Sequence, residues 1–507
     1  MLVKFLLAMI PVIWLLVGFS FLKLPGHKCC PIGLLLTFIV AMIFWKMPLL
    51  DTFTAGLEGA VMAIWPIGLI VIGAIFVYNL TIKTGGMDKI KQMLTSISPD
   101  KRVQVIIVGW CFGGFLEGIA GFGTSVAIPA GILVGLGFDP ILACVVCLMS
   151  NVPVAVFGAV GIPTTTAAAV TGLSSAALAA DTVIMLALLI VVCPIVMAAI
   201  TGKLKGVFGI ALISGVSFAV PAYFLGAYTG AELPCFIGSV VSLGCTIAAV
   251  KLFKHAPAPE YCMEAPSGSA SGAPAMSFKE GFMAWVPFLL IFVFLFLCST
   301  LVPPIHDVVA SVKSGVHIYT GNPDSKYTFS WINTPGVLII LSGVIGGLLQ
   351  GASFAEIAKV FVDSIKQMSK SLITIVSILS ISKIMGYSGM IKDIALALVA
   401  ITGGFYPVLA PWIGGIGTFI TGSVTSSSSI FSGLQHEAAT ALNMDPLWLV
   451  AANGAGATVG KIISPQSVAI ATAATGCIGA DSEIIRKCLG YMIVFMLYLS
   501  AVCYFFA

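Results

Sequence analysis

The feature that most constrains this chain is a glycine-rich, polar interruption inside sequence that is otherwise apolar enough for a membrane. Between residues 113 and 163 the chain reads GGFLEGIAGFGTS, then GLGFDP, then SNVPVAVFGAVGIP, and a related set lies between residues 412 and 465. Unpaired backbone N–H and C=O groups are costly in hydrocarbon, so irregular backbone at membrane depth must be buried in protein or line a watery cavity. Two such interruptions therefore predict one shared site near the middle of the membrane.

A nearly constant spacing relates the two interruptions. Asn151 and Asn453 lie 302 positions apart (453 − 151), and so do Pro163 and Pro465 (465 − 163). At the first tip, GFGTS of residues 121–125 aligns with GSVTS starting at residue 422, but GFGT also aligns with GIGT starting at residue 415. The chain is thus expected to contain two structural repeats, with both registers of the second tip open.

Composition places the chain in a membrane. Hydrophobic residues make up 59% of it and charged residues 9%, and the mean hydropathy is +1.11. Soluble domains have roughly 45–50% apolar residues and about 25% charged residues. The net charge is only +4, and Lys and Arg are scattered between apolar runs, which gives no nucleic-acid patch. The 13 cysteines fall mostly in apolar runs, where they serve as small core residues. We expect no metal site, no disulfide framework and no cofactor.

Apolar runs of about 20 residues, long enough to cross a bilayer, predict an all-α polytopic fold with about 12 spans. The first run, residues 2–21, has no small-x-small cleavage site after it and is expected to be a retained helix. Residues 103–138 form two short limbs around the first tip, which predicts a re-entrant hairpin. Residues 141–180 carry Gly and Pro in their middle, which predicts one spanning helix broken near mid-membrane. Mixed segments at 83–102 and 354–370 are expected to lie outside the spans.

A linker rich in Pro, Ala, Ser and Gly divides the chain. The predicted parts are a first inverted repeat (1–201), two connecting transmembrane helices (202–253), a cytoplasmic linker (254–281) and a second inverted repeat (282–507). A polar loop is expected at 303–334. Basic segments favour the cytoplasm, and placing all of them there puts both termini outside and inverts the halves. Each half then has about five transmembrane helices, a re-entrant hairpin and a broken helix.

A carboxylate in a dry cavity needs hydrogen-bond donors, which helix N-termini supply. Four helices are expected to begin at the interruptions, beside residues that can cap a helix or donate a hydroxyl. The alternative is that these small residues only allow close packing. The candidate substrate-binding residues are Gly121, Gly123, Thr124, Ser125, Asn151, Thr164, Thr165, Gly422, Ser423, Thr425, Ser426, Ser427, Asn453, Lys461, Ser464 and Gln466.

Charged residues inside apolar runs are the other candidates. Glu117 lies four residues before Gly121 in an apolar limb, and a charge at the bilayer centre costs about 2.5–3.5 kcal/mol on insertion scales, so it is a functional candidate or a partnered structural residue. Lys461, in GKIISPQ, can neutralise a substrate, pair with a carboxylate or snorkel to the surface. Lys383 is a weaker candidate. His436 begins HEAAT, which lacks the second His of a zinc motif and places a polar residue near the outer end of the second hairpin.

At these motifs the chain resembles the bacterial L-lactate permease family. The resemblance covers nearly the whole chain and is strongest in GGFLEGIAGFGTS, GLGFDP, FGAVGIP, GGIGTFITGS and GKIISPQ. It implies import of L-lactate and related 2-hydroxymonocarboxylates such as glycolate by proton symport, across a bacterial cytoplasmic (inner) membrane. Glu117 and His436 are the candidate proton-coupling residues. The family pattern usually has Asn where this chain has Val424, Ser429 and Ser467, and Pro where it has Ser125.

Three other functions remain alternatives. A sodium-coupled carboxylate or dicarboxylate transporter and an anion channel are two of them, because either would have the composition of a polytopic membrane protein. The motif GYSG at residues 386–389 resembles that of intramembrane serine proteases, with His436 as a base. Its counterpart in the first half, TGGM, contains no Ser, so turn chemistry explains the motif better and we expect no enzyme. The expected partners are a small monocarboxylate, a proton and the lipid bilayer; the oligomeric state stays open.

Overall fold

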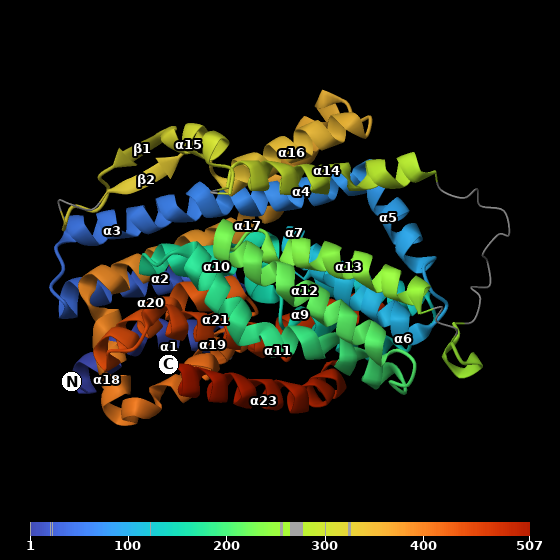
Figure 1. The fold of residues 1–507 in the computed structure, drawn as a ribbon. Coiled ribbons are helices and arrows are strands. Elements are labelled where there is room, and N and C mark those ends of the chain that lie inside the picture. The colour runs from blue at the N-terminus through green and yellow to red at the C-terminus, as the bar shows by residue number, and fades with distance from the viewer. Residues whose placement is uncertain are drawn as a thin grey trace.

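The computed structural model describes residues 2–20, 22, 24–121, 123–253, 257–263, 277–299, 301–322 and 326–507. Helices run through nearly all of the described chain (Figure 1). Its one sheet has two antiparallel strands, β1 (Lys313–Val316) and β2 (Tyr327–Ser330), with Lys313 opposite Ser330. The expected all-α membrane fold is therefore confirmed.

Thirteen α-helices of the described residues precede the linker, two pairs of them joined by π-helical segments at Ala63–Gly68 and Val105–Phe112. They are α1 (Leu2–Ser20), α2 (Gly26–Phe44), α3 (Leu49–Met62), α4 (Leu69–Lys83), α5 (Gly86–Thr95), α6 (Lys101–Gln104), α7 (Gly113–Ile119), α8 (Thr124–Gly135), α9 (Pro140–Asn151), α10 (Gly158–Thr171), α11 (Ser175–Thr201), α12 (Phe208–Thr229) and α13 (Pro234–Leu252).

Ten α-helices follow the linker in the described residues. They are α14 (Phe278–Leu297), α15 (Pro303–Ser311), α16 (Pro335–Leu349), α17 (Phe354–Ser388), α18 (Met390–Thr402), α19 (Tyr406–Thr421), α20 (Val424–Leu442), α21 (Pro446–Lys461), α22 (Pro465–Thr475) and α23 (Asp481–Phe506).

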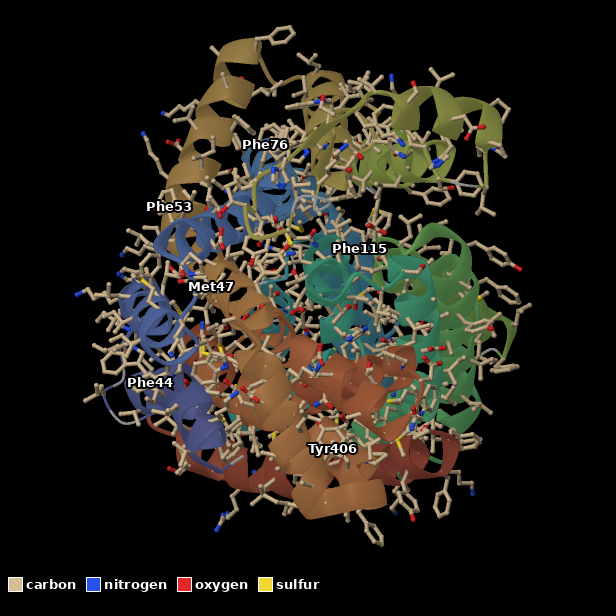
Figure 2. All side chains as sticks on the ribbon, turned by 90° about the vertical axis from the view of Figure 1, so that its left-hand side faces the viewer. Phe44, Met47, Phe53, Phe76, Phe115 and Tyr406 are labelled. Atoms are coloured by element: carbon tan, nitrogen blue, oxygen red, sulfur yellow. The ribbon has the colours of Figure 1, made fainter. Side chains whose placement is uncertain are left out.

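The number of spans agrees closely with the expectation of about 12. Ten helical segments of the described chain are long and apolar enough to cross a membrane, the hairpin limb Lys101–Ile119 among them, and the bent pair α9 and α10 makes eleven. Two expected spans, α1 and α16, are shorter apolar helices. Figure 2 shows the division between core and periphery: Phe76, Phe115 and Tyr406 are buried, whereas Phe44 and Phe53 project outward where lipid would contact them.

Figure 1 shows both termini at one end of the molecule, together with β1, β2 and α15. The helices α5 and α6 lie at the opposite end. Because α5 carries part of the basic segment that we assign to the cytoplasm, this arrangement is compatible with termini outside. The inverted relation of the two halves stays a prediction.

Two helical hairpins carry the predicted tips. The first runs from Lys101 through α7 to a tip at Gly121 and Gly123, both with positive φ (56° and 87°), and returns through α8. The second consists of α19 and α20 with its tip at Gly422 (φ 70°). Gly415 lies inside α19, so only the alignment with GSVTS is right.

The first limb differs from the expectation of two short limbs. It is continuous for 19 residues, from Lys101 to Ile119, because the π-helical segment carries the helix through GWCF without a break. The second limb, α8, has only 12 residues. The hairpin is thus asymmetric.

Both predicted broken helices are present. The pair α9 and α10 bends by 65°, and Ala159, Val160 and Gly161 all have positive φ before regular helix resumes. Val160 is β-branched, so this conformation persists only because the surrounding packing imposes it. In the second half, α21 ends at Lys461 and α22 begins at Pro465.

Two local expectations were wrong. Residues 354–370 do not lie apart from the following apolar run, because α17 continues for 35 residues from a capping box of Ser353 and Glu356. No Gly or Pro interrupts it before Gly386, and its polar first half only reflects contact with water. The expected polar loop at 303–334 contains α15 and the β1–β2 hairpin.

Candidate functional site

A buried ion pair joins the two halves of the chain. Lys461 Nζ, at the end of α21, lies 3.1 Å from Glu117 Oε1, on α7 of the first hairpin. The side chains of Glu117 and Lys461 are 3% and 12% exposed. Removing one member of such a pair leaves an uncompensated buried charge, which costs about 3–5 kcal/mol.

The other oxygen of the carboxylate is also occupied. Asn151 Nδ2, at the end of α9, donates to Glu117 Oε2 over 2.8 Å and to Ser125 Oγ over 2.9 Å. The Ser125 hydroxyl donates to the same carboxylate oxygen. Four helices therefore converge on Glu117: α7, α8, α9 and α21.

Glycine makes this convergence possible at one position. A Cβ added at Gly158, at the start of α10, would overlap Glu117 Oε1. Gly158 has φ −64° and ψ 152°, so the backbone itself does not demand glycine there. The requirement for glycine comes from the close approach of the α10 start to the carboxylate.

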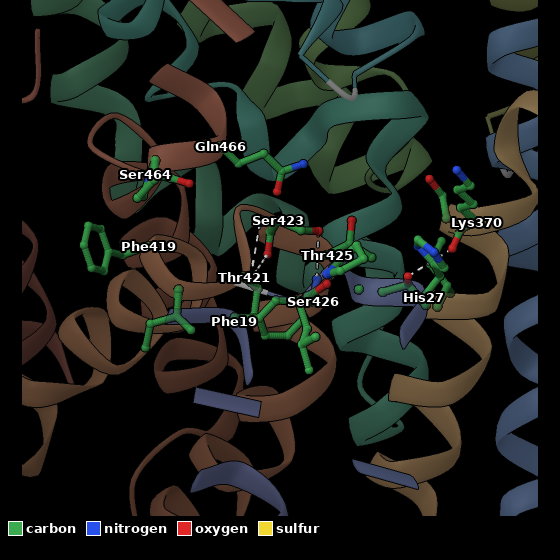
Figure 3. Close-up of a pocket in the computed structure, with 18 residues that line it drawn as sticks. Phe19, His27, Lys370, Phe419, Thr421, Ser423, Thr425, Ser426, Ser464 and Gln466 are labelled. Atoms are coloured by element: carbon green, nitrogen blue, oxygen red, sulfur yellow. Dashed lines mark hydrogen bonds between the residues drawn. The ribbon is translucent and has the colours of Figure 1, made fainter. Parts of the chain in front are cut away.

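A cavity of about 720 Å³ lies at the tip of the second hairpin (Figure 3). One wall consists of the hairpin tip and the start of α22, and the other of the α1–α2 turn and the middle of α17. Pro25, Lys370 and Gln466 are exposed within it, so the cavity is open to the surface. The lining residues that bear on binding are His27, Lys370, Thr374, Thr421, Ser423, Thr425, Ser426, Ser464 and Gln466.

The start of α22 offers unused hydrogen-bond donors to this cavity. Ser464 occupies the N-cap position, but its side chain makes no cap hydrogen bond. Its Oγ is buried and has no partner in the part of the chain that the structure describes. The first N–H groups of a helix also lack intrahelical partners and carry the positive end of the helix dipole. By contrast, Ser423 already caps α20, because its Oγ accepts from Ser426 N over 3.2 Å.

The predicted helix starts are confirmed within a few residues, at Thr124, after Gly161, at Val424 and at Pro465. The structure divides the predicted binding residues into three groups. Ser125, Asn151 and Lys461 surround Glu117. Ser423, Thr425, Ser426, Ser464 and Gln466 line the cavity. Gly121, Gly123 and Thr124 form the first tip, and Gly123 approaches Ile470 of α22; Gly422 forms the second tip and approaches Gln466.

The remaining predicted residues lie outside these groups. The hydroxyls of Thr164, Thr165 and Ser427 donate to backbone carbonyls, those of Val156, Gly161 and Gly414. Asn453 Oδ1 accepts from Gln435 Nε2 over 3.4 Å within the second half.

His436 lines a separate cavity of about 260 Å³, together with Lys383, Tyr387 and Glu437. Lys383 Nζ lies 2.9 Å from Glu58 Oε1, which also accepts from the Tyr387 hydroxyl over 2.7 Å. The structure thus contains a second buried Glu–Lys pair, which brings together α3 and α17. Sequence reasoning missed Glu58 because the expected span began at Ile64; extending the helix back to Leu49 would have found an acid inside it.

Sequence reasoning also missed His27 and Lys370. Both are basic residues close to the ends of apolar runs, a position in which Lys and His usually anchor a helix to the membrane surface. Only the fold brings them to one cavity. Among the described residues no group of three or more His, Cys, Asp or Glu could hold a metal ion.

Comparison with known proteins agrees with this picture. The family model described as L-lactate permease matches residues 4–507. An L-lactate permease of Streptococcus iniae is 45% identical over 450 residues, covering 88% of this chain and 93% of the relative. The glycolate permease GlcA of Escherichia coli (strain K12) is 33% identical over 97% of this chain and 93% of its own. An L-lactate permease of Bacillus subtilis (strain 168) is 30% identical over 98% of this chain and 94% of its own length.

Solved structures show the same fold at low identity. MtrF of Neisseria gonorrhoeae, from a class of antimetabolite efflux pumps, superposes with a TM-score of 0.55 at 13% identity and covers 97% of both chains. At this identity the similarity concerns the fold alone. The family match over nearly the whole length, together with relatives of 30–45% identity, carries the assignment. The chain belongs to the L-lactate permease family.

Proposed function

We propose that this protein imports L-lactate and related small 2-hydroxymonocarboxylates, glycolate among them, by proton symport across the bacterial inner membrane. The names of the relatives support the substrate class. The observation that carries the proton coupling is the buried Glu117–Lys461 pair. Lys461 lies three residues before Ser464, which lines the open cavity.

The cavity chemistry suits one carboxylate with a neighbouring hydroxyl. Its described lining residues include two basic side chains and several hydroxyls, and no Asp or Glu. The free N–H groups at the start of α22 and the Ser464 hydroxyl are donors for a carboxylate. The Gln466 amide can both donate to and accept from the 2-hydroxyl group.

Proton coupling follows from competition for Lys461. While Glu117 is ionised, Lys461 is held by it and is not available to a substrate. A proton on Glu117 removes that negative charge and releases Lys461 to pair with the substrate carboxylate. Because the ammonium has one anionic partner in either case, proton binding and substrate binding favour each other, and this coupling is reciprocal.

The same exchange opposes uncoupled movement. The empty site with ionised Glu117 is neutral overall, and so is the site loaded with a proton and a monocarboxylate. A proton alone would leave a net positive charge in the buried site, and a substrate alone a net negative charge. Both are costly in an apolar environment. Only the two neutral states would then cross the membrane readily.

The neighbours of Glu117 can serve both protonation states. The Ser125 hydroxyl donates to the carboxylate in the structure and can rotate to accept from a carboxylic acid. Asn151 Oδ1 is buried and has no partner in the described chain, so it offers another acceptor. These groups let the acid remain in place while Lys461 changes partner.

The direct test is transport by the purified protein in liposomes. An inwardly directed proton gradient alone should drive accumulation of labelled L-lactate, and unlabelled glycolate should compete. Accumulation driven by a sodium gradient without a pH difference would favour the sodium-coupled alternative. Stronger competition by succinate than by glycolate would show that the substrate class is wrong.

A further inference from the structure

The second wall of the cavity is basic and belongs to a different part of the fold from the hairpin tip. Figure 3 shows His27 and Lys370 near each other on this wall, with Gln466 and Ser464 on the other. We propose that His27 and Lys370 form a release-side subsite, which binds the substrate carboxylate between its central position and the cytoplasm. The inference rests on the proposed function, because it assigns the same substrate to a second position.

The subsite is built where two helices meet. A Cβ added at Gly26, the first residue of α2, would lie 2.8 Å from Thr374 Oγ1 of α17. Lys370 lies one helical turn before Thr374, so this contact brings His27 and Lys370 to the same wall. The N-terminus of α2 follows Pro25, which provides no side-chain cap. Its first N–H groups therefore add to the positive potential of the wall.

Nothing acidic on the described cavity wall neutralises these groups. Lys370 is exposed and makes no ion pair in the described chain, whereas Lys366, one turn earlier, pairs with Asp363. A concave wall lined by one sign of charge concentrates ions of the opposite sign. The buried, partnerless Ser464 hydroxyl on the facing wall supplies an independent indication that a polar ligand enters between the walls.

The position of the subsite predicts that its effect on substrate affinity differs between the two sides of the membrane. Lys366 and Lys370 belong to the basic segment 359–370, which we assign to the cytoplasmic side from the distribution of Lys and Arg. The hairpin tip and α22 form one wall, and α2 and α17 form the other, so the second wall assists a ligand only while the two walls face one cavity. We expect His27 and Lys370 to matter for substrate on the cytoplasmic side and little for substrate arriving from outside.

The experiment compares L-lactate transport by right-side-out and inside-out membrane vesicles. The double variant His27→Gln/Lys370→Met should raise the KM for lactate on the cytoplasmic side about fivefold to tenfold, as expected for the loss of charge-assisted hydrogen bonds. The KM on the external side should stay within about twofold, and Lys370→Arg should retain most of the affinity. Matched controls are Lys359→Met and Lys28→Met, exposed lysines of the same helices that do not line the cavity.

Two results would overturn the subsite. One is an unchanged cytoplasmic KM in the double variant, and the other is an equal rise on both sides. The external KM also reports folding, because a misfolded variant would lose transport in both directions. Failure of the proposed function is separate: the unsubstituted protein would then show no proton-driven lactate transport, and the subsite would fall with it.

Discussion

At the residue scale, the fold gives Lys461 a partner that its sequence position does not reveal. Both Glu117 and Lys461 stand out in the sequence as charges within apolar runs, because such residues are costly unless they are paired or functional. Their pairing could not be predicted, since the two residues are 344 positions apart and meet only through the packing of α21 against the first hairpin. His436 also stands out in the sequence as a polar residue, but the fold places it away from Glu117 and Lys461. It lines a separate cavity with Lys383.

Glu117→Gln should separate exchange from accumulation. Glutamine has the shape of the protonated acid, so Lys461 would be free for substrate and exchange of lactate at equal concentrations should continue. Accumulation driven by a pH difference should be lost, because the site no longer gains or loses a proton. Liposome assays with internal and external lactate measure both. Continued pH-driven accumulation would remove Glu117 from the proton pathway.

Lys461→Met should abolish lactate binding and also reduce stability. The substitution leaves the Glu117 carboxylate buried without a counter-charge, which costs about 3–5 kcal/mol. Thermal unfolding in detergent should show a lower midpoint than for the unsubstituted protein. The double variant Glu117→Gln/Lys461→Met should recover most of the loss, since neither charge remains. A double variant as unstable as Lys461→Met would contradict the pairing.

At the element scale, the sequence predicted the breaks better than the continuities. Gly and Pro act locally, so the tips at Gly121 and Gly422 and the interruptions before Ile162 and Pro465 could be located from spacing alone. The length of α17 could not, because its change from polar to apolar residues marks a change of surroundings rather than an end of the helix. Of the two π-helical segments, Ala63–Gly68 contains Pro66, whereas Val105–Phe112 contains no Pro that would mark it in the sequence.

Gly158→Ala tests the close approach of α10 to the carboxylate. The new methyl group would overlap Glu117 Oε1 and should displace the acid from Lys461, with loss of most proton-driven uptake. Gly135→Ala is the matched control, because a Cβ at Gly135 of α8 meets open space. Uptake by both variants should be compared at equal amounts of folded protein. Normal uptake by Gly158→Ala would show that this contact does not position Glu117.

At the scale of the whole molecule, hydropathy predicted the membrane fold and nearly the right number of spans. The division into residues 1–201, 202–253, 254–281 and 282–507, and the inverted relation of its two repeats, remain our proposal. Equivalent local chemistry supports it, because Asp139 and Asp445 each accept a backbone N–H at the start of a broken helix, from Leu142 and Leu447. Inversion cannot be derived from such local matches, since it depends on the direction of each crossing.

Asp139→Cys and Asp445→Cys, each introduced into a variant that lacks the native cysteines, should react with a maleimide from opposite sides of the membrane. We place Asp445 outside and Asp139 inside, so a membrane-impermeant maleimide added to intact cells should label Asp445→Cys and leave Asp139→Cys unlabelled. Permeabilised cells should show labelling of both. Labelling of both positions from the same side would exclude the inverted repeat.

The central claim is that a proton on Glu117 releases Lys461 for the substrate carboxylate. Proton uptake by the purified protein on binding saturating L-lactate, followed in weakly buffered solution, tests this most directly. At a pH where the empty protein holds Glu117 ionised, we predict uptake of about one proton per lactate bound, following from the reciprocal coupling of the two ligands. The Glu117→Gln variant should bind lactate with no proton uptake. Lactate binding without proton uptake by the unsubstituted protein, or equal uptake by the variant, would contradict the account.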